Sequence, residues 1–147
     1  LSAGMMPVSA VLADDEIMLT IKPGEHGSTY GGNPLACAVA MTSLRVLKEE
    51  KMAENAAVRG EQLRKGLADL HSRHISLIRG KGLLNAIVIN HPDKEAAWEL
   101  CLQLKDNGLL AKPTHGDKIR FAPPLLITEA QINEAVAIIG KSLDSLG

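Results

Sequence analysis

The segment from residue 20 to residue 33 limits the fold of this chain more than any other. It holds one proline and four glycines, namely Pro23, Gly24, Gly27, Gly31 and Gly32. Glycine weakens helices and strands alike, because it has the most backbone freedom to lose on folding. We therefore predict a long, specialised loop here. Asn33 and Pro34 are typical of an N-cap and a first helical residue, so a helix is expected to follow.

The residues on both sides of this loop are mostly apolar. Residues 35–47 are almost continuously apolar, which predicts a helix buried on most of its sides. Residues 8–13 form a shorter apolar run, which predicts a buried strand. The acidic residues 14–16 predict the start of a short helix, because negative charge is favourable at a helix N-terminus, and we assign them no catalytic role.

Residues 51–147 alternate between helical and strand patterns. One apolar stripe is formed by Leu63, Leu67 and Leu70, and Thr128 with Gln131 is typical of a capping box. The patterns predict helices over 53–71, over 93–104 and after Thr128, and strands over 75–78, 83–89, 109–111 and 118–121. The predicted fold class is therefore α/β, with residues 1–50 as one piece and residues 51–147 as an α+β lobe.

Composition excludes several classes of function. Sixteen Lys and Arg stand against seventeen Asp and Glu, so the net charge of -1 provides no field to hold a nucleic acid or an anionic membrane. No apolar run approaches the roughly 20 residues that cross a bilayer. Cys37 and Cys101 lie too far apart in sequence for a zinc or redox pair. We expect two buried free thiols in a reducing compartment, and no secretion.

The glycine-rich loop has the chemistry of an anion site. Its backbone can approach an anion closely, and Ser28 and Thr29 add hydroxyl donors beside the start of a helix. We expect a phosphate group here, although a plain glycine-rich connection capped by Asn33 has equal weight on composition alone. A nucleotide P-loop is excluded, because Asn33 and Pro34 stand where that motif requires Lys and then Ser or Thr.

Arg120 is the second candidate, because a guanidinium at a strand end can clamp a carboxylate with two parallel hydrogen bonds. On general grounds a surface ion pair is the commoner role for an arginine. His71 and His74 are interpreted as a solvated helix end, since no third metal ligand is near in sequence. His26 and His115 lie in the two special loops, where they line a pocket or brace the loop. We predict no metal site.

Several segments resemble the class III aminotransferases that depend on pyridoxal phosphate. Residues 23–35 resemble the family's signature loop, and residues 79–84 resemble the strand that opens its small domain. Residues 109–117 and 119–125 resemble the end of that domain that binds carboxylates. The resemblance implies the C-terminal part of a fold type I transferase. Residues 1–50 would end the large cofactor-binding domain, and residues 51–147 would form the small domain.

The resemblance implies roles for three residues. The positions of Thr29 and Ser28 bind the cofactor phosphate of the neighbouring subunit in this family, so the active site would be shared across a homodimer. The position of Arg120 receives the α-carboxylate of the substrate. The family's cofactor-binding lysine precedes the stretch that matches residues 1–7. We therefore expect no catalytic residue in this chain, and we expect the chain to be an inactive fragment of an active enzyme.

The sequence of these segments most resembles the branch of the family that acts on ornithine. That branch transfers the terminal amino group of ornithine to 2-oxoglutarate, in a cytoplasm or a mitochondrial matrix. Two alternatives stay open. One is a branch with another amino donor, either acetylornithine or 4-aminobutyrate. The other is a fragment without catalytic activity that keeps the dimer surface and the phosphate loop for binding or assembly.

Overall fold

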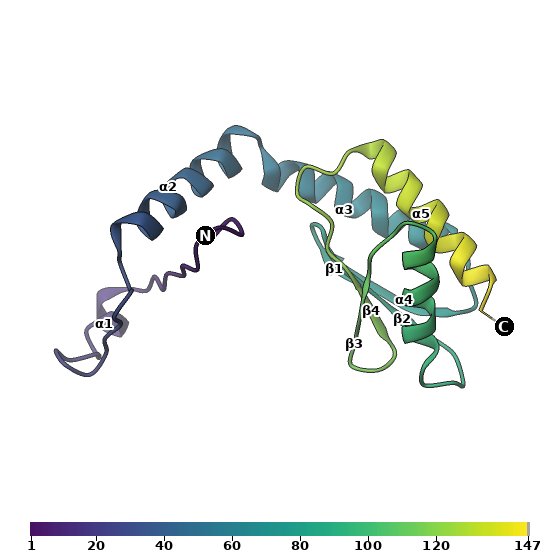
Figure 1. Cartoon of the computed structure of the whole chain (residues 1–147), viewed down its shortest axis with the longest axis horizontal. Coiled ribbons are helices and arrows are strands. Elements are labelled where there is room, and N and C mark those ends of the chain that lie inside the picture. Colours follow the sequence, from purple (N-terminus) through teal and green to yellow (C-terminus); the bar gives the residue numbers. More distant parts are fainter. Residues whose placement is uncertain (147) are drawn as a thin grey trace. The chain divides into compact units, whose positions relative to one another are not determined.

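The computed structural model describes residues 1–146 and divides into two compact units, Leu1–Glu50 and Lys51–Gly147. The elements in chain order are α1 (Asp15–Met18), α2 (Pro34–Glu49), α3 (Met52–Asp69), β1 (Ile75–Lys81), β2 (Leu84–Ile89), α4 (Ala96–Asp106), β3 (Lys112–Thr114), β4 (Lys118–Phe121) and α5 (Glu129–Asp144) (Figure 1). None of the helices within residues 1–146 has the length and apolar character needed to cross a membrane. The assignment of residues 1–50 to the end of a larger cofactor-binding domain stays a prediction.

The first unit consists of two helices joined by the glycine-rich loop. The predicted start of α2 is confirmed, because Pro34 is its first residue and the Asn33 Oδ1 atom accepts a hydrogen bond from the Ala36 amide at 2.9 Å. The predicted strand over residues 8–13 is wrong, since this run is irregular and Leu12 is 95% exposed. A strand needs a neighbour to pair with, and the described residues of this unit provide none.

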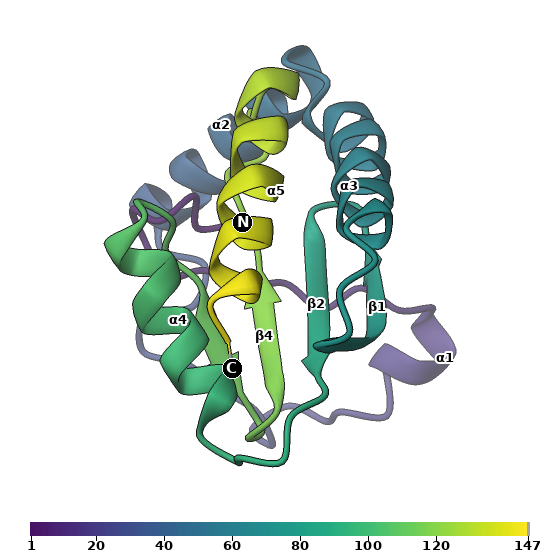
Figure 2. The same cartoon turned by 90° about the vertical axis from the view of Figure 1, so that its right-hand side faces the viewer.

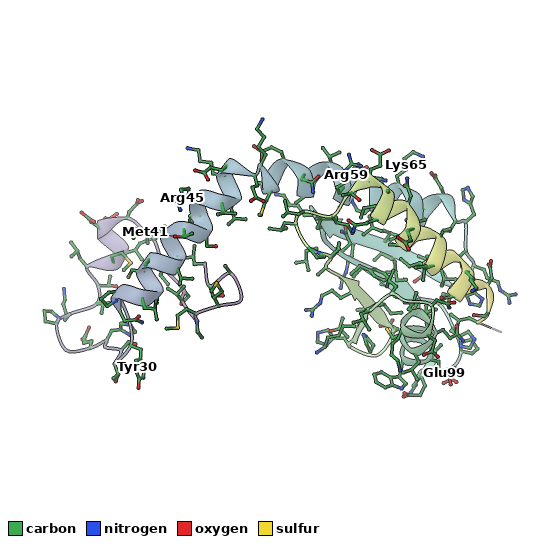
Figure 3. All side chains as sticks on the ribbon, turned by 45° about the horizontal axis from the view of Figure 1, so that its top comes forward. Tyr30, Met41, Arg45, Arg59, Lys65 and Glu99 are labelled. Carbon is green, nitrogen blue, oxygen red and sulfur yellow. The ribbon has the colours of Figure 1, made fainter. Side chains whose placement is uncertain are left out.

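Helix α2 is far less buried than its sequence predicts. Ala36 is its single buried residue, whereas Met41 is 67% exposed and projects from the helix in Figure 3. The prediction of a helix buried on most of its sides is therefore wrong for α2 within this chain. An apolar sequence shows that a helix can be buried, but the residues that cover it must come from elsewhere in the molecule.

The second unit is built on a four-stranded sheet in the order β1-β2-β4-β3, and each neighbouring pair is antiparallel. The predicted strands near 75–78, 83–89 and 118–121 are confirmed. The strand predicted over 109–111 is wrong, because β3 begins at Lys112. Strand β3 lies at one edge of the sheet, which explains why it tolerates Pro113, because a proline has no amide hydrogen to donate to a neighbouring strand.

Helices α3, α4 and α5 all lie on one face of this sheet (Figure 2). The stripe of Leu63 and Leu67 on α3 is buried as predicted, and it packs with Ile87, Ile119 and Ile139 in one apolar cluster. The opposite face carries no helix among the described residues of this unit.

The α5 capping box is confirmed. Helix α4 begins at Ala96 instead of near 93, where the Asp93 side chain accepts a bond from the Glu95 amide in a turn before the helix.

A close approach of backbone to backbone holds α3 against the turn between β1 and β2. A Cβ atom at Gly60 would lie 1.9 Å from the Gly82 carbonyl oxygen, so only glycine fits. The buried Asn85 side chain reinforces this contact, because its Oδ1 atom accepts from Arg64 at 2.8 Å and its Nδ2 atom donates to Gly82 at 3.0 Å. These contacts fix β2, which in turn aligns β4 and its Arg120.

Candidate functional site

The glycine-rich loop is shaped by hydrogen bonds within itself. The Ser28 Oγ atom accepts a hydrogen bond from the Gly31 amide at 2.9 Å. A Cβ atom at Gly31 would lie 2.9 Å from the Ser28 Cβ atom, so this tight turn requires glycine. The Asn33 Nδ2 atom donates to the Tyr30 carbonyl at 2.7 Å. The side chains at both ends of the turn therefore hold residues 28–33 in one shape.

The hydroxyls of Ser28 and Thr29 are the free donors of this loop. Ser28 uses a lone pair toward Gly31, which leaves its hydrogen available. Thr29 is exposed, and within residues 1–146 its hydroxyl has no hydrogen-bond partner. The start of α2 offers less, because Pro34 lacks an amide hydrogen and Asn33 accepts from both the Ala36 and Cys37 amides. An anion at this loop would therefore be held by the two hydroxyls and by amides of the loop itself, rather than by the first turn of α2.

A hollow of about 540 Å³ inside the first unit is lined by Ser28 but not by Thr29. Its walls are Ser2, Pro7, Val8, Ser9, Ser28, Tyr30, Gly31, Gly32 and Ala36. Tyr30 is 81% exposed, and its ring projects away from the ribbon in Figure 3. The Ser28 hydroxyl, the glycine backbone and this space leave room for a phosphate group, and the phosphate site stays a prediction.

Arg120 lies on the open face of the sheet, away from the helices. Its neighbours on β4, Ile119 and Phe121, are buried under the helices, so alternation along the strand turns Arg120 to the other face. In register it stands opposite Ala86 on β2 and Lys112 on β3. No acidic side chain among residues 1–146 forms an ion pair with it. The structural ion pair that is the commoner role for an arginine is therefore not formed here.

Lys112 is a residue that sequence reasoning missed. The signal that could have found it is the turn between β3 and β4, in which His115 and Gly116 both have positive φ, at 51° and 77°. Such a turn fixes the register of the two strands, and the register places Lys112 directly opposite Arg120. Lys118 lies on the same face, but it forms an ion pair with Asp117. The hydrogen bond from Lys118 lowers the pKa of Asp117, and the charge of Arg79 adds to this effect.

His26 and His115 lie in the two loops, as the sequence places them, but His26 is not among the residues that line the hollow beside Ser28. His71 is exposed, as predicted, but His74 is only 7% exposed, so the interpretation of both as a solvated helix end is wrong for His74. Its ring lies 5.8 Å from that of His91, and its Nε2 atom accepts from Arg73. The strand pairing that follows α3 brings these rings together. Within residues 1–146, no group of three or more His, Cys, Asp or Glu is arranged to hold a metal ion.

The two cysteines differ, although both are predicted to be buried. Cys101 is buried on α4, and this burial raises the pKa of its thiol from an ordinary 9.0 to about 11. Cys37 is exposed on α2, so the prediction is wrong for this residue. The reason is the same as for the rest of α2, whose apolar sides have no covering residues in the first unit.

The chain is similar to known proteins over nearly its whole length. The family model described as aminotransferase class-III matches residues 1–143. The chain is 64% identical over 146 residues to the mitochondrial ornithine aminotransferase of Drosophila melanogaster, a match that covers 99% of this chain and 33% of that protein. The corresponding protein of Rattus norvegicus is 63% identical over 143 residues, with 97% and 33% covered. The chain thus spans about a third of the length of these curated relatives.

Solved structures show the same fold. The crystal structure of acetylornithine aminotransferase from Elizabethkingia anophelis superposes with a TM-score of 0.91 at 57% sequence identity, and the match covers 99% of this chain and 39% of that one. The α+β unit with its four-stranded antiparallel sheet therefore has the architecture found in this enzyme. From the family match and these relatives, we conclude that the chain belongs to the class III aminotransferases.

Proposed function

We propose that the protein acts as an ornithine aminotransferase. The reaction transfers the terminal amino group of ornithine to 2-oxoglutarate, and the products are glutamate 5-semialdehyde and glutamate. One observation carries the proposal: relatives named ornithine aminotransferase are 64% and 63% identical to this chain over nearly all of its residues. The similarity includes the phosphate loop and Arg120, which lie within the aligned stretch.

Thr29 and Ser28 hold the phosphate of pyridoxal phosphate in this proposal. Two features support it, namely the free hydroxyl hydrogens beside a glycine turn and the hollow that Ser28 lines. A phosphate dianion takes up hydroxyl donors of this kind in charge-assisted hydrogen bonds. The bound cofactor supplies an electron sink for the amino-group transfer, while the loop only binds and orients it.

Arg120 orients the substrate by its α-carboxylate. Its guanidinium is exposed, it is free of ion pairs within residues 1–146, and it stands on a strand fixed by pairing on both sides. A planar fork of donors on a rigid strand determines the direction of a carboxylate as well as its position. The 2-oxo acid would therefore be held at its reacting end.

The active site would be shared between two subunits, and we place the enzyme in the mitochondrial matrix or the cytoplasm. The names of the Drosophila and rat relatives support the first compartment. The proposal also requires a lysine from outside these 147 residues, because Lys22, Lys81 and Lys112 belong to other motifs. A preparation of these 147 residues alone is then expected to turn over no ornithine in the presence of pyridoxal phosphate. Turnover by it would contradict this part of the proposal.

Kinetics with different amino donors test the substrate. The full-length enzyme should use ornithine with a higher kcat/KM than acetylornithine or 4-aminobutyrate. The second candidate is acetylornithine, which the 57% identical Elizabethkingia structure favours. A preference for acetylornithine would replace our proposal with that one.

Reading the gene upstream of Leu1 tests the binding or assembly alternative, which is excluded if a cofactor lysine lies in frame there.

A further inference from the structure

We propose that Lys112 and Arg120 together form the site for the substrate carboxylate, so that Lys112 is a second residue that positions the dicarboxylic 2-oxo acid. The inference rests on the proposed function of Arg120 and adds a residue to it. The observation behind it is the register of the sheet, which places Lys112 directly opposite Arg120.

The two cations share one face of the sheet. Residues directly opposite each other in an antiparallel pair have Cβ atoms about 4.5–5.5 Å apart and point to the same side. Arg120 is on the open face, because Ile119 is 0% and Phe121 5% exposed on the face under the helices. Lys112 is exposed on the same open face. Its backbone is also restricted, because a residue before a proline is confined to extended conformations.

The charges of this pair are not balanced within residues 1–146. Like charges directly opposite each other destabilise a sheet, and neither Lys112 nor Arg120 forms an ion pair with a described acidic residue. Lys118 on the same face differs in this respect, because it is paired with Asp117. An anion that bridges Lys112 and Arg120 would relieve the repulsion between them.

The donors of the pair suit a carboxylate. On its other side Arg120 faces Ala86, whose methyl group leaves the guanidinium uncovered. The two oxygens of a carboxylate offer about four lone pairs, of which a guanidinium fork uses two. The ammonium of Lys112 can donate to one that remains. Arg120 would then set the orientation of the carboxylate, and Lys112 would add affinity.

The test uses the full-length holoenzyme and three variants. Lys112→Gln removes the charge, Lys112→Arg keeps it, and Lys81→Gln is the matched control, because Lys81 lies on the same face at the far end of β1. Two readouts are the KM for 2-oxoglutarate and the Kd for glutarate, a five-carbon dicarboxylate that cannot accept an amino group. Calorimetry measures the second without any turnover.

Lys112→Gln should raise both constants about tenfold, as expected for the loss of one hydrogen bond between charged groups. The kcat at saturating 2-oxoglutarate and the KM for ornithine should stay within twofold of wild type. Lys112→Arg should restore both constants, and Lys81→Gln should change neither by more than twofold. Two results would overturn the inference. If Lys112→Gln and Lys81→Gln raise the KM and the Kd equally, the effect is one of general charge. If Lys112→Gln changes neither constant, Lys112 does not contact the carboxylate.

The outcome for the wild type separates this inference from the proposed function. A wild-type enzyme that uses 2-oxoglutarate with a donor other than ornithine would contradict the proposed donor and leave the carboxylate site to be judged by the variants. A wild-type enzyme that neither uses 2-oxoglutarate nor binds glutarate would overturn both.

Discussion

The two units of this chain use the same local signals but bury very different amounts of apolar surface. In residues 1–50 only Ala36 is a buried hydrophobic residue among those described, although α2 is mostly apolar. In residues 51–146 a continuous cluster under the sheet joins α3, α4 and α5. The caps and turns decide where elements begin and end in both units. Burial depends on whether residues distant in sequence provide a second layer, and only the second unit has one.

The largest difference should appear when one leucine is shortened in each unit. Leu104 on α4 is 0% exposed, whereas Leu44 on α2 is 52% exposed. Leu104→Ala should lower the free energy of unfolding by about 2–5 kcal/mol, because it removes apolar contacts and leaves a cavity. Leu44→Ala should change it by less than about 0.5 kcal/mol. Urea denaturation of the chain at low concentration measures both.

A large loss of stability for Leu44→Ala would contradict this comparison, and its dependence on protein concentration would show why. A loss that grows with protein concentration would show that a second subunit covers α2, because association stabilises the folded state by mass action. A loss independent of concentration would show that the first unit has a core of its own, contrary to the exposure of its side chains.

The comparison extends to function, because the first unit is proposed to hold the cofactor and the second the substrate. Thr29→Ala in the full-length enzyme should raise the Kd for pyridoxal phosphate roughly tenfold to a hundredfold, for the loss of a hydrogen bond to a charged group. Thr42→Ala is the matched control, since Thr42 is an exposed threonine on α2. Titration of the apoenzyme measures the Kd. Unchanged cofactor affinity would argue against the phosphate site.

Arg120→Lys should have the complementary effect. The ammonium of lysine cannot reproduce the planar fork, so the KM for 2-oxoglutarate should rise about tenfold while the Kd for the cofactor stays the same. Arg45→Lys, at an exposed arginine on α2 (Figure 3), serves as the control. Steady-state kinetics at saturating ornithine measure this KM. An effect of Arg120→Lys on cofactor affinity instead would show that the two roles are not divided between the units.

The sequence was sufficient where a signal acts over a few residues. Asn33 with Pro34 and Thr128 with Gln131 start helices at the predicted residues, because a cap satisfies amides only two or three residues away. It was insufficient where the outcome depends on a distant partner. The run over residues 8–13 has the composition of a strand but no strand to pair with, and His74 is buried by contacts that its own segment does not reveal.

The candidate sites show the same division. Ser28, Thr29 and Asn33 lie in one short segment, so the sequence alone was enough to predict that their polar groups act together. Arg120 could be identified as a possible carboxylate clamp, but its freedom from ion pairs and the position of Lys112 depend on strand register. Register is set by the turn at His115 and Gly116, whose positive φ values are a conformational fact that a sequence pattern only partly encodes.

The smallest predicted effect is the difference in reactivity between the two cysteine thiols, one in each unit. Cys37 in the first unit is exposed, whereas burial raises the pKa of Cys101 in the second unit to about 11. At pH 8 a thiol reagent should modify one cysteine in the native chain and two in urea, and peptide mapping should identify the native site as Cys37. Because the unfolded chain loses the Cys101 proton near pH 9.0, this residue should reduce stability progressively between pH 9 and 11. A Cys101→Ala variant should lose that dependence. If Cys37 proves unreactive in the native chain, α2 is covered, and the contrast between an open first unit and a closed second one is wrong.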